Sequence, residues 1–439
     1  MKFLCTLGLL LMAWLPSQAQ KKIEFTEYDL PNGLHVILHQ DKSLPTIAVT
    51  VMYHVGSKNE NPARTGFAHF FEHLLFEGTE NIKRGEYDKY VQNAGGTLNA
   101  NTFYDRTFYY ELLPSNQLAL GLWLESERML HAKVETEGIE TQRQVVKEER
   151  RQRVENQPYG SLLEECMKRA FTSHPYKWPV IGSMAHLDAA ETADYVNFYK
   201  TFYVPNNAIL SIAGNLDIAE SKKLVEQFFG GIPRGTGEVY RPKMKEPTLR
   251  SEVRDTVFDN IQLPAVVLTY RTVPQGTPDY YAVNMLNTLL SQGESSRLSK
   301  KMVDEEQSSV YVGSFPLSME DDGVSIVFGI CNAGVPPADV EKTLNAEIER
   351  TRTELITEDE FQKLRNQMET QFVDGNSTVA GVAENLAQYK MYFGNTELIN
   401  NEIDLYMKVT REDIKRVAEK YFSQKARVVL YYLPKTAEP

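Results

Sequence analysis

The sequence contains one pattern twice, and this internal duplication limits the possible folds more than any other feature. The Leu-Pro pair at 44–45 precedes an alternating strand-like run, and the Leu-Pro pair at 263–264 precedes a similar run 219 positions later. Tyr203 before a second apolar run recurs as Tyr421, 218 positions later, and an apolar helical stretch between these landmarks recurs with an offset of 214. Three landmarks in one order predict a duplicated unit of about 210 residues.

Each predicted domain combines strands with helices. Strand-like runs alternate with long amphipathic stretches such as 185–199 and 358–372. This mixture is typical of a sheet with helices packed on it, so we predict an α+β fold of two homologous α/β-sandwich-like domains. A segment rich in glycine and proline marks the join. The predicted bounds are an N-terminal domain at 20–232, a linker at 233–250 and a C-terminal domain at 251–436.

The first 19 residues have the composition of a secretory signal peptide. Lys2 is followed by an apolar run at 3–15 and by small residues within 17–19, where a signal peptidase cleaves. The apolar run is too short for a permanent membrane anchor. Cys5 precedes most of the run, whereas a cysteine for lipid attachment would follow it. We therefore predict export to the periplasm or beyond, without lipidation and without an integral membrane segment once residues 1–19 are removed.

Composition excludes some classes of function. Lysine and arginine number 47 against 59 acidic residues, a formal charge of −12, and no basic stripe occurs. We therefore expect no nucleic-acid partner. Removal of the signal peptide leaves Cys166 and Cys331, which form either one disulfide or two buried thiols. Since no Cys-x-x-Cys motif occurs, histidine and carboxylate must hold any metal.

The segment at 66–76 carries the most specific chemical signal. All eight histidines fall in the first half of the chain, and His69 and His73 lie one helical turn apart on this segment. Both imidazoles can therefore reach one zinc ion, and Glu72 is close enough to accept a proton from a metal-bound water. His-x-x-Glu-His is the inverted zinc-protease motif. The alternative is a pair of core or surface histidines, but burying both with a carboxylate is costly unless a metal or partner neutralises them.

A third ligand has to come from another segment. Residues 135–155 predict a long polar helix with a narrow apolar edge that includes Val145 and Val146. Glu149 falls between these valines on the helical wheel, whereas Glu148 falls towards solvent. On this geometry Glu149 is the candidate ligand. The alternative, that both acids pair with nearby arginines on a solvated face, stays open at this point.

With these residues, the chain resembles the pitrilysin–insulinase family of zinc metallopeptidases, especially half-size members related to mitochondrial processing peptidase. Residues 66–79 match the family signature, and 145–149 match the Val-Val-x-Glu-Glu-like context of the third ligand. The resemblance implies one Zn²⁺ per chain, held by the two histidines and Glu149. It also implies that Glu72 acts as the general base. Because the second half contains no histidine, the C-terminal domain is expected to lack metal ligands.

The resemblance extends to residues that contact substrate. Residues 95–102 are similar to the family's edge strand, so Asn99 and Ala100 are expected to pair with an extended peptide. The alternative is a glycine turn that leads into a core strand. In the C-terminal domain, Tyr311 stands where the family has a tyrosine associated with substrate binding, and its alternative is an ordinary strand aromatic.

Two departures from the family pattern bear on activity. Gln142 stands where many active relatives have a glutamate, seven residues before the third ligand. It can still contact groups around the metal ligands, but it supplies no negative charge. An arginine expected six or seven residues before Tyr311 is replaced by Asp304 or Glu305. These departures favour a homodimer, or a heterodimer with a homologous subunit that supplies the missing arginine.

The sequence therefore predicts an exported zinc-dependent endopeptidase or oligopeptidase that hydrolyses unfolded peptides. In this interpretation the metal lowers the pKa of its water and polarises the scissile carbonyl, while Glu72 takes the proton and hands it to the leaving amine. The alternative is a catalytically weak subunit, or a binding or assembly protein of the same fold, that needs a homologous partner.

Overall fold

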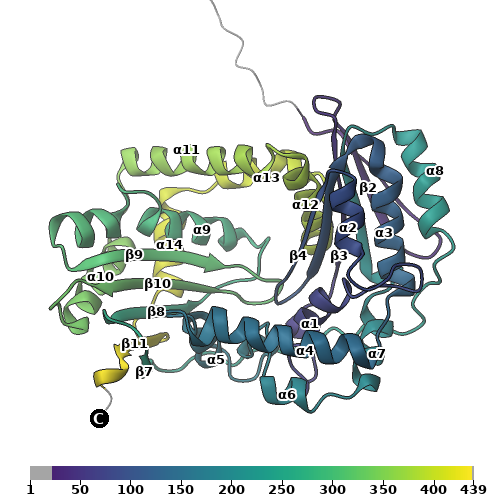
Figure 1. Ribbon diagram of the computed structural model, residues 1–439. Coiled ribbons are helices and arrows are strands. Elements are labelled where there is room, and N and C mark those ends of the chain that lie inside the picture. The colour runs from purple at the N-terminus through teal and green to yellow at the C-terminus, as the bar shows by residue number, and fades with distance from the viewer. Residues whose placement is uncertain (1–21, 438–439) are drawn as a thin grey trace, which may run out of the picture.

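The computed structural model describes residues 22–437, so the predicted signal peptide at 1–19 lies outside the described residues. Two mixed sheets form the framework (Figure 1). The first sheet has the order β1 (Thr26–Asp29), β2 (His35–Gln40), β6 (Ala208–Gly214), β3 (Thr46–Tyr53), β5 (Thr107–Pro114) and β4 (Thr97–Thr102). The second has the order β7 (Val253–Asp259), β11 (Val428–Pro434), β8 (Ala265–Arg271), β10 (Val324–Cys331) and β9 (Ser309–Leu317).

Apart from the additional edge strand β1 of the first sheet, the two sheets have the same topology. In the first, β2 pairs parallel with β6, and the neighbours from β6 through β3 and β5 to β4 are antiparallel. In the second, β7 pairs parallel with β11, and the neighbours from β11 through β8 and β10 to β9 are antiparallel. The strands β3 and β8, which follow the two Leu-Pro pairs, occupy equivalent central positions. The predicted fold of two homologous α/β domains is therefore confirmed.

Helices cover the sheets of both halves. The first half contains α1 (Phe67–Leu74), α2 (Tyr87–Asn93), α3 (Leu118–His131), α4 (Thr136–Arg150), α5 (Leu162–Ala170), α6 (Met184–Asp188), α7 (Thr192–Phe202) and α8 (Ile218–Phe229). The second contains α9 (Pro278–Ser291), α10 (Pro337–Thr353), α11 (Glu358–Gly375), α12 (Val379–Gln388), α13 (Leu398–Met407) and α14 (Arg411–Tyr421). Within residues 22–437, none of these helices has the length and apolar character needed to cross a bilayer.

Helix α12 of the second half covers the first sheet. It packs on β2, β3 and β6, on the face away from α3 (Figure 1). Its Val382 and Leu386 share a buried cluster with Met52 and Ile209 of that sheet. The opposite face of the same strands contacts helices of the first half, including α3. Both faces of β3 are therefore buried, which explains its nearly continuous apolar sequence.

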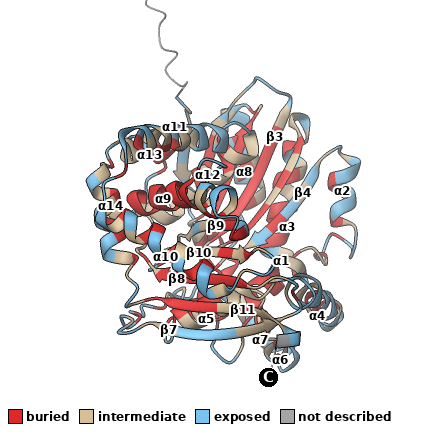
Figure 2. Ribbon diagram, turned by 90° about the vertical axis from the view of Figure 1, so that its left-hand side faces the viewer, coloured by how far each residue is buried: buried red, intermediate tan, exposed pale blue. Residues whose placement is uncertain are grey.

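Helix α5 of the first half makes the reciprocal contact with the second sheet. It packs on β8 and β11, which are the strands equivalent to β3 and β6. Met167 and Ala170 share a buried cluster with Val267 and Leu430. Figure 2 shows the resulting buried strands in the centre of both sheets. Each half therefore supplies one helix to the core of the other, and the halves are packed together rather than joined only by the linker.

The two cysteines of the described chain are free and buried. Cys166 of α5 belongs to the cluster on one face of the second sheet, and Cys331 at the end of β10 belongs to the cluster on the other face. A sheet therefore separates the two thiols. Of the two alternatives that the sequence left open, the structure has two buried thiols.

Candidate metal centre

Helix α1 begins at a position that only glycine fills easily. Gly66 has φ +95°, and a Cβ there would lie 2.7 Å from the carbonyl oxygen of Ile181. The buried carboxylate of Glu60 accepts hydrogen bonds from the backbone N–H groups of Gly66 and Ala68, at 2.9 Å each, and so caps the helix. Burial raises the pKa of Glu60 to about 8, although these N–H groups oppose the increase. The start of the helix that carries both histidines is therefore fixed.

The long helix α4 brings Glu149 to the two histidines of α1. Glu149 Oε2 lies 3.4 Å from His69 Nε2 and 3.1 Å from His73 Nε2. The imidazole rings are tilted to each other with centroids 4.9 Å apart. One donor atom from each residue lies within 4.8 Å of the other two, so the three side chains form a group that could hold a metal ion.

The donor set and its spacing fit zinc. Nitrogen and oxygen donors about 2.0–2.2 Å from a tetrahedral zinc lie roughly 3.4 Å from each other. Within the described residues, the buried Oε2 of Glu149 contacts the two imidazoles and has no other hydrogen-bond partner. Burial acts to raise the pKa of Glu149, but hydrogen bonds and attraction from His69 and His73 outweigh it and hold the pKa well below its usual range.

The expected helix is present, but its predicted apolar edge is partly wrong. Helix α4 continues through a wider π-type turn at Arg151–Glu155. Val146 is fully buried, whereas Val145 is 42% exposed. The face of α4 that packs against the protein carries polar residues near the histidines as well as Val146. The apolar Val145 was therefore not a reliable guide to the buried face. Glu148 faces solvent, as predicted, and pairs with Arg151 at 2.9 Å.

Glu72 lies on α1 and makes a contact that sequence reasoning missed. Thr102 Oγ1, from the last residue of β4, donates a hydrogen bond of 2.7 Å to Glu72 Oε2. The two residues are 30 positions apart, and α1 packs on β4. Alternation along the strand places Thr102 on the same face as the buried Ala100, and that pattern is the signal that could have pointed to the contact.

Strand β4 lies at the edge of the first sheet, where it pairs with β5. The expected edge position is therefore observed for residues 97–102, and a core strand is excluded for this segment. Asn99 is exposed and Ala100 is buried. Asn99 Oδ1 accepts a hydrogen bond of 2.9 Å from the backbone N–H of Ala100. A peptide that paired with this amide would have to replace the Asn99 side chain.

The remaining predicted residues lie in two places. Gln142 on α4 donates a hydrogen bond to Glu77, which follows α1. Tyr311 lies on β9, at the edge of the second sheet, and is 58% exposed with its ring centroid 5.8 Å from that of Phe328. Asp304 lies in a π-type turn at Ser299–Glu305.

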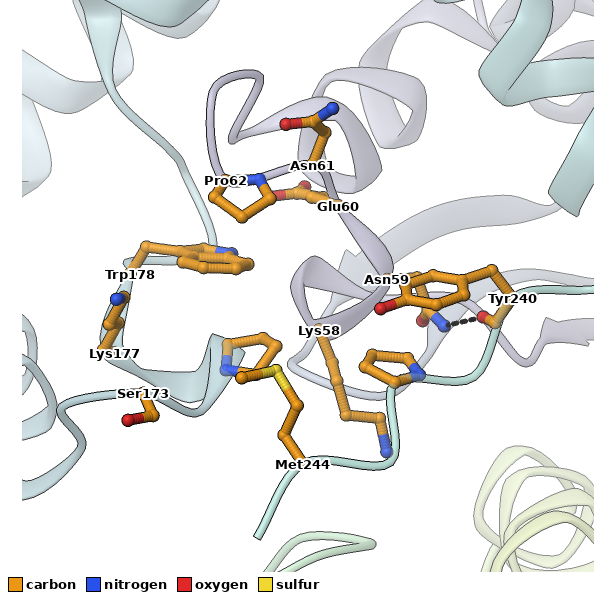
Figure 3. Close-up of a pocket in the computed structure, with 12 residues that line it drawn as sticks. Lys58, Asn59, Glu60, Asn61, Pro62, Ser173, Lys177, Trp178, Tyr240 and Met244 are labelled. Atoms are coloured by element: carbon orange, nitrogen blue, oxygen red, sulfur yellow. Dashed lines mark hydrogen bonds between the residues drawn. The ribbon is translucent and has the colours of Figure 1, made fainter. Parts of the chain in front are cut away.

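A cavity of about 390 Å³ lies beside the start of α1 (Figure 3). Its walls include Glu60, Trp178, Tyr240 and Met244, and Figure 3 shows the two aromatic rings on opposite sides of it. The three candidate ligands are not among its lining residues. The cavity is therefore separate from the candidate metal centre. Glu60 connects the two, because it lines the cavity and its carboxylate caps α1, the helix that carries the two histidines.

Two family models match the chain. The family model described as "Insulinase (Peptidase family M16)" matches residues 35–183, which include the candidate ligands. The model described as "Peptidase M16 inactive domain" matches residues 191–368.

Individual relatives match along most of the chain. The zinc protease PqqE of Helicobacter pylori is 32% identical over 413 residues, which cover 92% of each chain. The mitochondrial-processing peptidase subunit beta of Blastocladiella emersonii is 26% identical, over 89% of this chain and 85% of the relative. The crystal structure of a protease from Helicobacter pylori superposes with a TM-score of 0.90 and 28% identity, and covers 94% of this chain and 100% of that chain.

Proposed function

Because this chain belongs to the insulinase family of peptidases (peptidase family M16), we propose that it is an exported zinc-dependent endopeptidase or oligopeptidase that hydrolyses unfolded peptides. The observation that carries the proposal is the convergence of His69, His73 and Glu149, with a second carboxylate, Glu72, on the same helix as the histidines. The name of the relative from Helicobacter pylori, a zinc protease, supports the same metal.

In this proposal three side chains hold one Zn²⁺. His69 and His73 would hold it through their Nε2 atoms and Glu149 through Oε2, a set of three protein ligands like that of catalytic zinc sites. Zinc in such a site supplies a Lewis acid and lowers the pKa of a coordinated water. Gln142 has no charge to add, and its contact with Glu77 supports the end of α1 beyond His73.

Glu72 moves the proton in the proposed reaction. Its carboxylate accepts a proton from the attacking water and gives it to the leaving amine, so it ends the cycle unprotonated, as it began. Asn99 and Ala100 present the backbone of β4 to an extended peptide, and pairing with an edge strand requires no particular side-chain sequence. Tyr311, exposed on the edge strand of the second sheet, is a candidate contact for a longer peptide.

Substitution of Glu72 by glutamine tests the mechanism. We expect kcat for an unstructured fluorogenic peptide to fall by about 100- to 10,000-fold, because the amide cannot accept the proton. Zinc content should stay at about one per chain. Glu148→Gln is the control, since that acid faces solvent and pairs with Arg151. Full activity of zinc-loaded Glu72→Gln protein would refute the mechanism.

A second candidate function is a catalytically weak subunit, or a binding or assembly protein, that works with a homologous partner. Asp304 and Glu305 in place of the expected arginine favour it, and one relative is named as a subunit. Measuring hydrolysis by the purified chain, alone and after addition of a co-purifying homologue, separates the two candidates. Activity of the chain alone, as a monomer or homodimer, would exclude the need for a different subunit.

The predicted export belongs to the same proposal. Residues 1–19 carry its sequence evidence, and fractionation of cells that express the full chain would test it. We expect the protein outside the cytoplasm, starting near residue 20. A full-length chain retained in the cytoplasm would contradict the proposal.

A further inference from the structure

The hydroxyl of Thr102 is the hydrogen-bond donor to Glu72 within the described residues. Thr102 Oγ1 lies 2.7 Å from Glu72 Oε2, and no protein group in residues 22–437 donates to the other oxygen, Oε1. A hydroxyl that donates to a carboxylate makes a short, charge-assisted bond. The contact therefore holds one oxygen of Glu72 and leaves the other open to accept a proton.

The donor itself is held firmly. Thr102 pairs with Thr107 at the closed end of the β4–β5 hairpin, and the buried hydroxyl of Thr107 donates to the carbonyl of Val55 at 2.8 Å. A β-branched side chain on a paired strand has little rotational freedom. By contrast, a glutamate on a helix has three rotatable bonds and needs an outside contact to fix its carboxylate. The sheet therefore supplies the rigidity that Glu72 lacks.

We propose that Thr102 is a positioning residue that orients Glu72 for proton transfer. This inference rests on the proposed function and adds to it the group that aims the base. The Thr102 hydroxyl keeps its proton and stays on Oε2, while Oε1 receives the proton from water and releases it to the amine. Because Thr102 ends the strand proposed to bind the peptide, one strand would set the position of both substrate and base.

Two substitutions at Thr102 separate the hydroxyl from the shape of the side chain. Thr102→Val replaces the hydroxyl with a methyl group, and Thr102→Ser keeps the hydroxyl. We expect Thr102→Val to lower kcat by about 10-fold or more, with KM and zinc content within twofold of wild type. Thr102→Ser should recover most of kcat. Thr370→Val, on the exposed side of α11 in the second half, is the matched control and should be unchanged, because its hydroxyl donates to the carbonyl of Asn366 in the same helix.

A measurement without metal or turnover gives an independent test. In the metal-free protein, Glu72→Gln and Thr102→Val should destabilise together by less than the sum of their separate effects on unfolding, because Thr102→Val removes the hydrogen bond and Glu72→Gln removes the charge that strengthens it. Thr370→Val combined with Glu72→Gln should be additive. If Thr102→Val does not fold, Thr102→Ala serves as the second variant without a hydroxyl.

The outcomes distinguish this inference from the proposed function. Wild-type kcat in Thr102→Val protein, with Glu72→Gln inactive, would overturn the inference and leave the proposed function standing. Equal losses in Thr102→Val and Thr102→Ser, or a rise in KM at unchanged kcat, would also overturn it, because the hydroxyl would then not orient the base. Wild-type activity in Glu72→Gln protein would overturn the proposed function itself.

Discussion

At the scale of single residues, the two carboxylate oxygens of Glu149 contact different partners. Its Oε2 faces the two histidines, and its Oε1 lies 2.7 Å from the guanidinium of Arg153. Carboxylates that bind metals are commonly fixed by such outer contacts. The neighbouring acid, Glu148, makes the corresponding pair with Arg151 on the solvent side of the helix. Two adjacent acid–arginine pairs thus differ in whether they face the candidate metal centre.

We predict that Arg153→Ala weakens zinc binding about 10-fold, the lower end of the usual effect, because Arg153 is itself exposed. Competition with a chromogenic chelator measures the change. Arg151→Ala is the matched control and should bind zinc as tightly as wild type does. Equal affinity of both variants would mean that Arg153 does not support Glu149.

The residues of the candidate metal centre differ in how well the sequence alone predicted them. His69, His73 and Glu72 could be predicted because helical spacing alone places them within reach of one another. Glu149 required a second helix, and the family resemblance identified it where the helical wheel left an alternative. For Thr102, alternation along the strand indicated the face on which it lies, but its contact with Glu72 also depends on how the strand packs against a helix 30 positions earlier.

At the scale of elements, the exchange of α5 and α12 has a consequence for stability. Leu386 of α12 is fully buried against the first sheet, although it belongs to the second half of the chain. An amphipathic pattern shows that one face of such a helix is buried, but it does not show which sheet that face meets. The duplication therefore predicted the repeated strands and could not predict the exchanged helices.

We predict that Leu386→Ala lowers the free energy of unfolding by about 2–5 kcal/mol, because it leaves a cavity on the first sheet. Denaturant unfolding measures the loss, and hydrogen exchange locates it. The backbone amides of β3 and β6 should lose protection. Leu355→Ala, at a side chain that is 42% exposed, is the control and should have little effect. Loss of protection confined to the second half would contradict the packing described here.

At the scale of the whole molecule, a partly buried cluster of charges joins the two halves. Lys58 of the first half contacts Asp105 at 2.9 Å and Asp321 at 3.2 Å, and it also bonds Glu320. His54 lies 3.1 Å from the same carboxylate of Glu320. Burial acts to raise the pKa of Glu320, but His54 and Lys58 outweigh it and lower that pKa to about 2.

The lowered pKa makes this contribution to stability dependent on pH. The ionised Glu320 stabilises the folded protein above its unfolded pKa of 4.5, and the stabilisation is lost as the pH falls towards 2. We predict that Glu320→Gln lowers the free energy of unfolding by about 2 kcal/mol at pH 7, with the difference from wild type shrinking below pH 4.5. Urea unfolding at several pH values measures this difference.

The neighbouring Asp322 provides a control of opposite sign. Burial and the charge of Asp321 raise the pKa of Asp322, so its ionised form costs stability at neutral pH. Asp322→Asn should therefore leave stability at pH 7 unchanged or increase it. A Glu320→Gln difference that is constant from pH 7 to pH 2 would contradict the assigned role of Glu320.

The most direct test of the account is the zinc content of purified, zinc-reconstituted protein, measured by elemental analysis for wild type and for two adjacent variants. We predict about one zinc per chain in wild type and in Glu148→Gln, and loss of most of it in Glu149→Gln, because only Glu149 faces the two imidazoles. Wild-type zinc content in Glu149→Gln protein, or no zinc in wild type, would contradict the central claim that His69, His73 and Glu149 form one metal site.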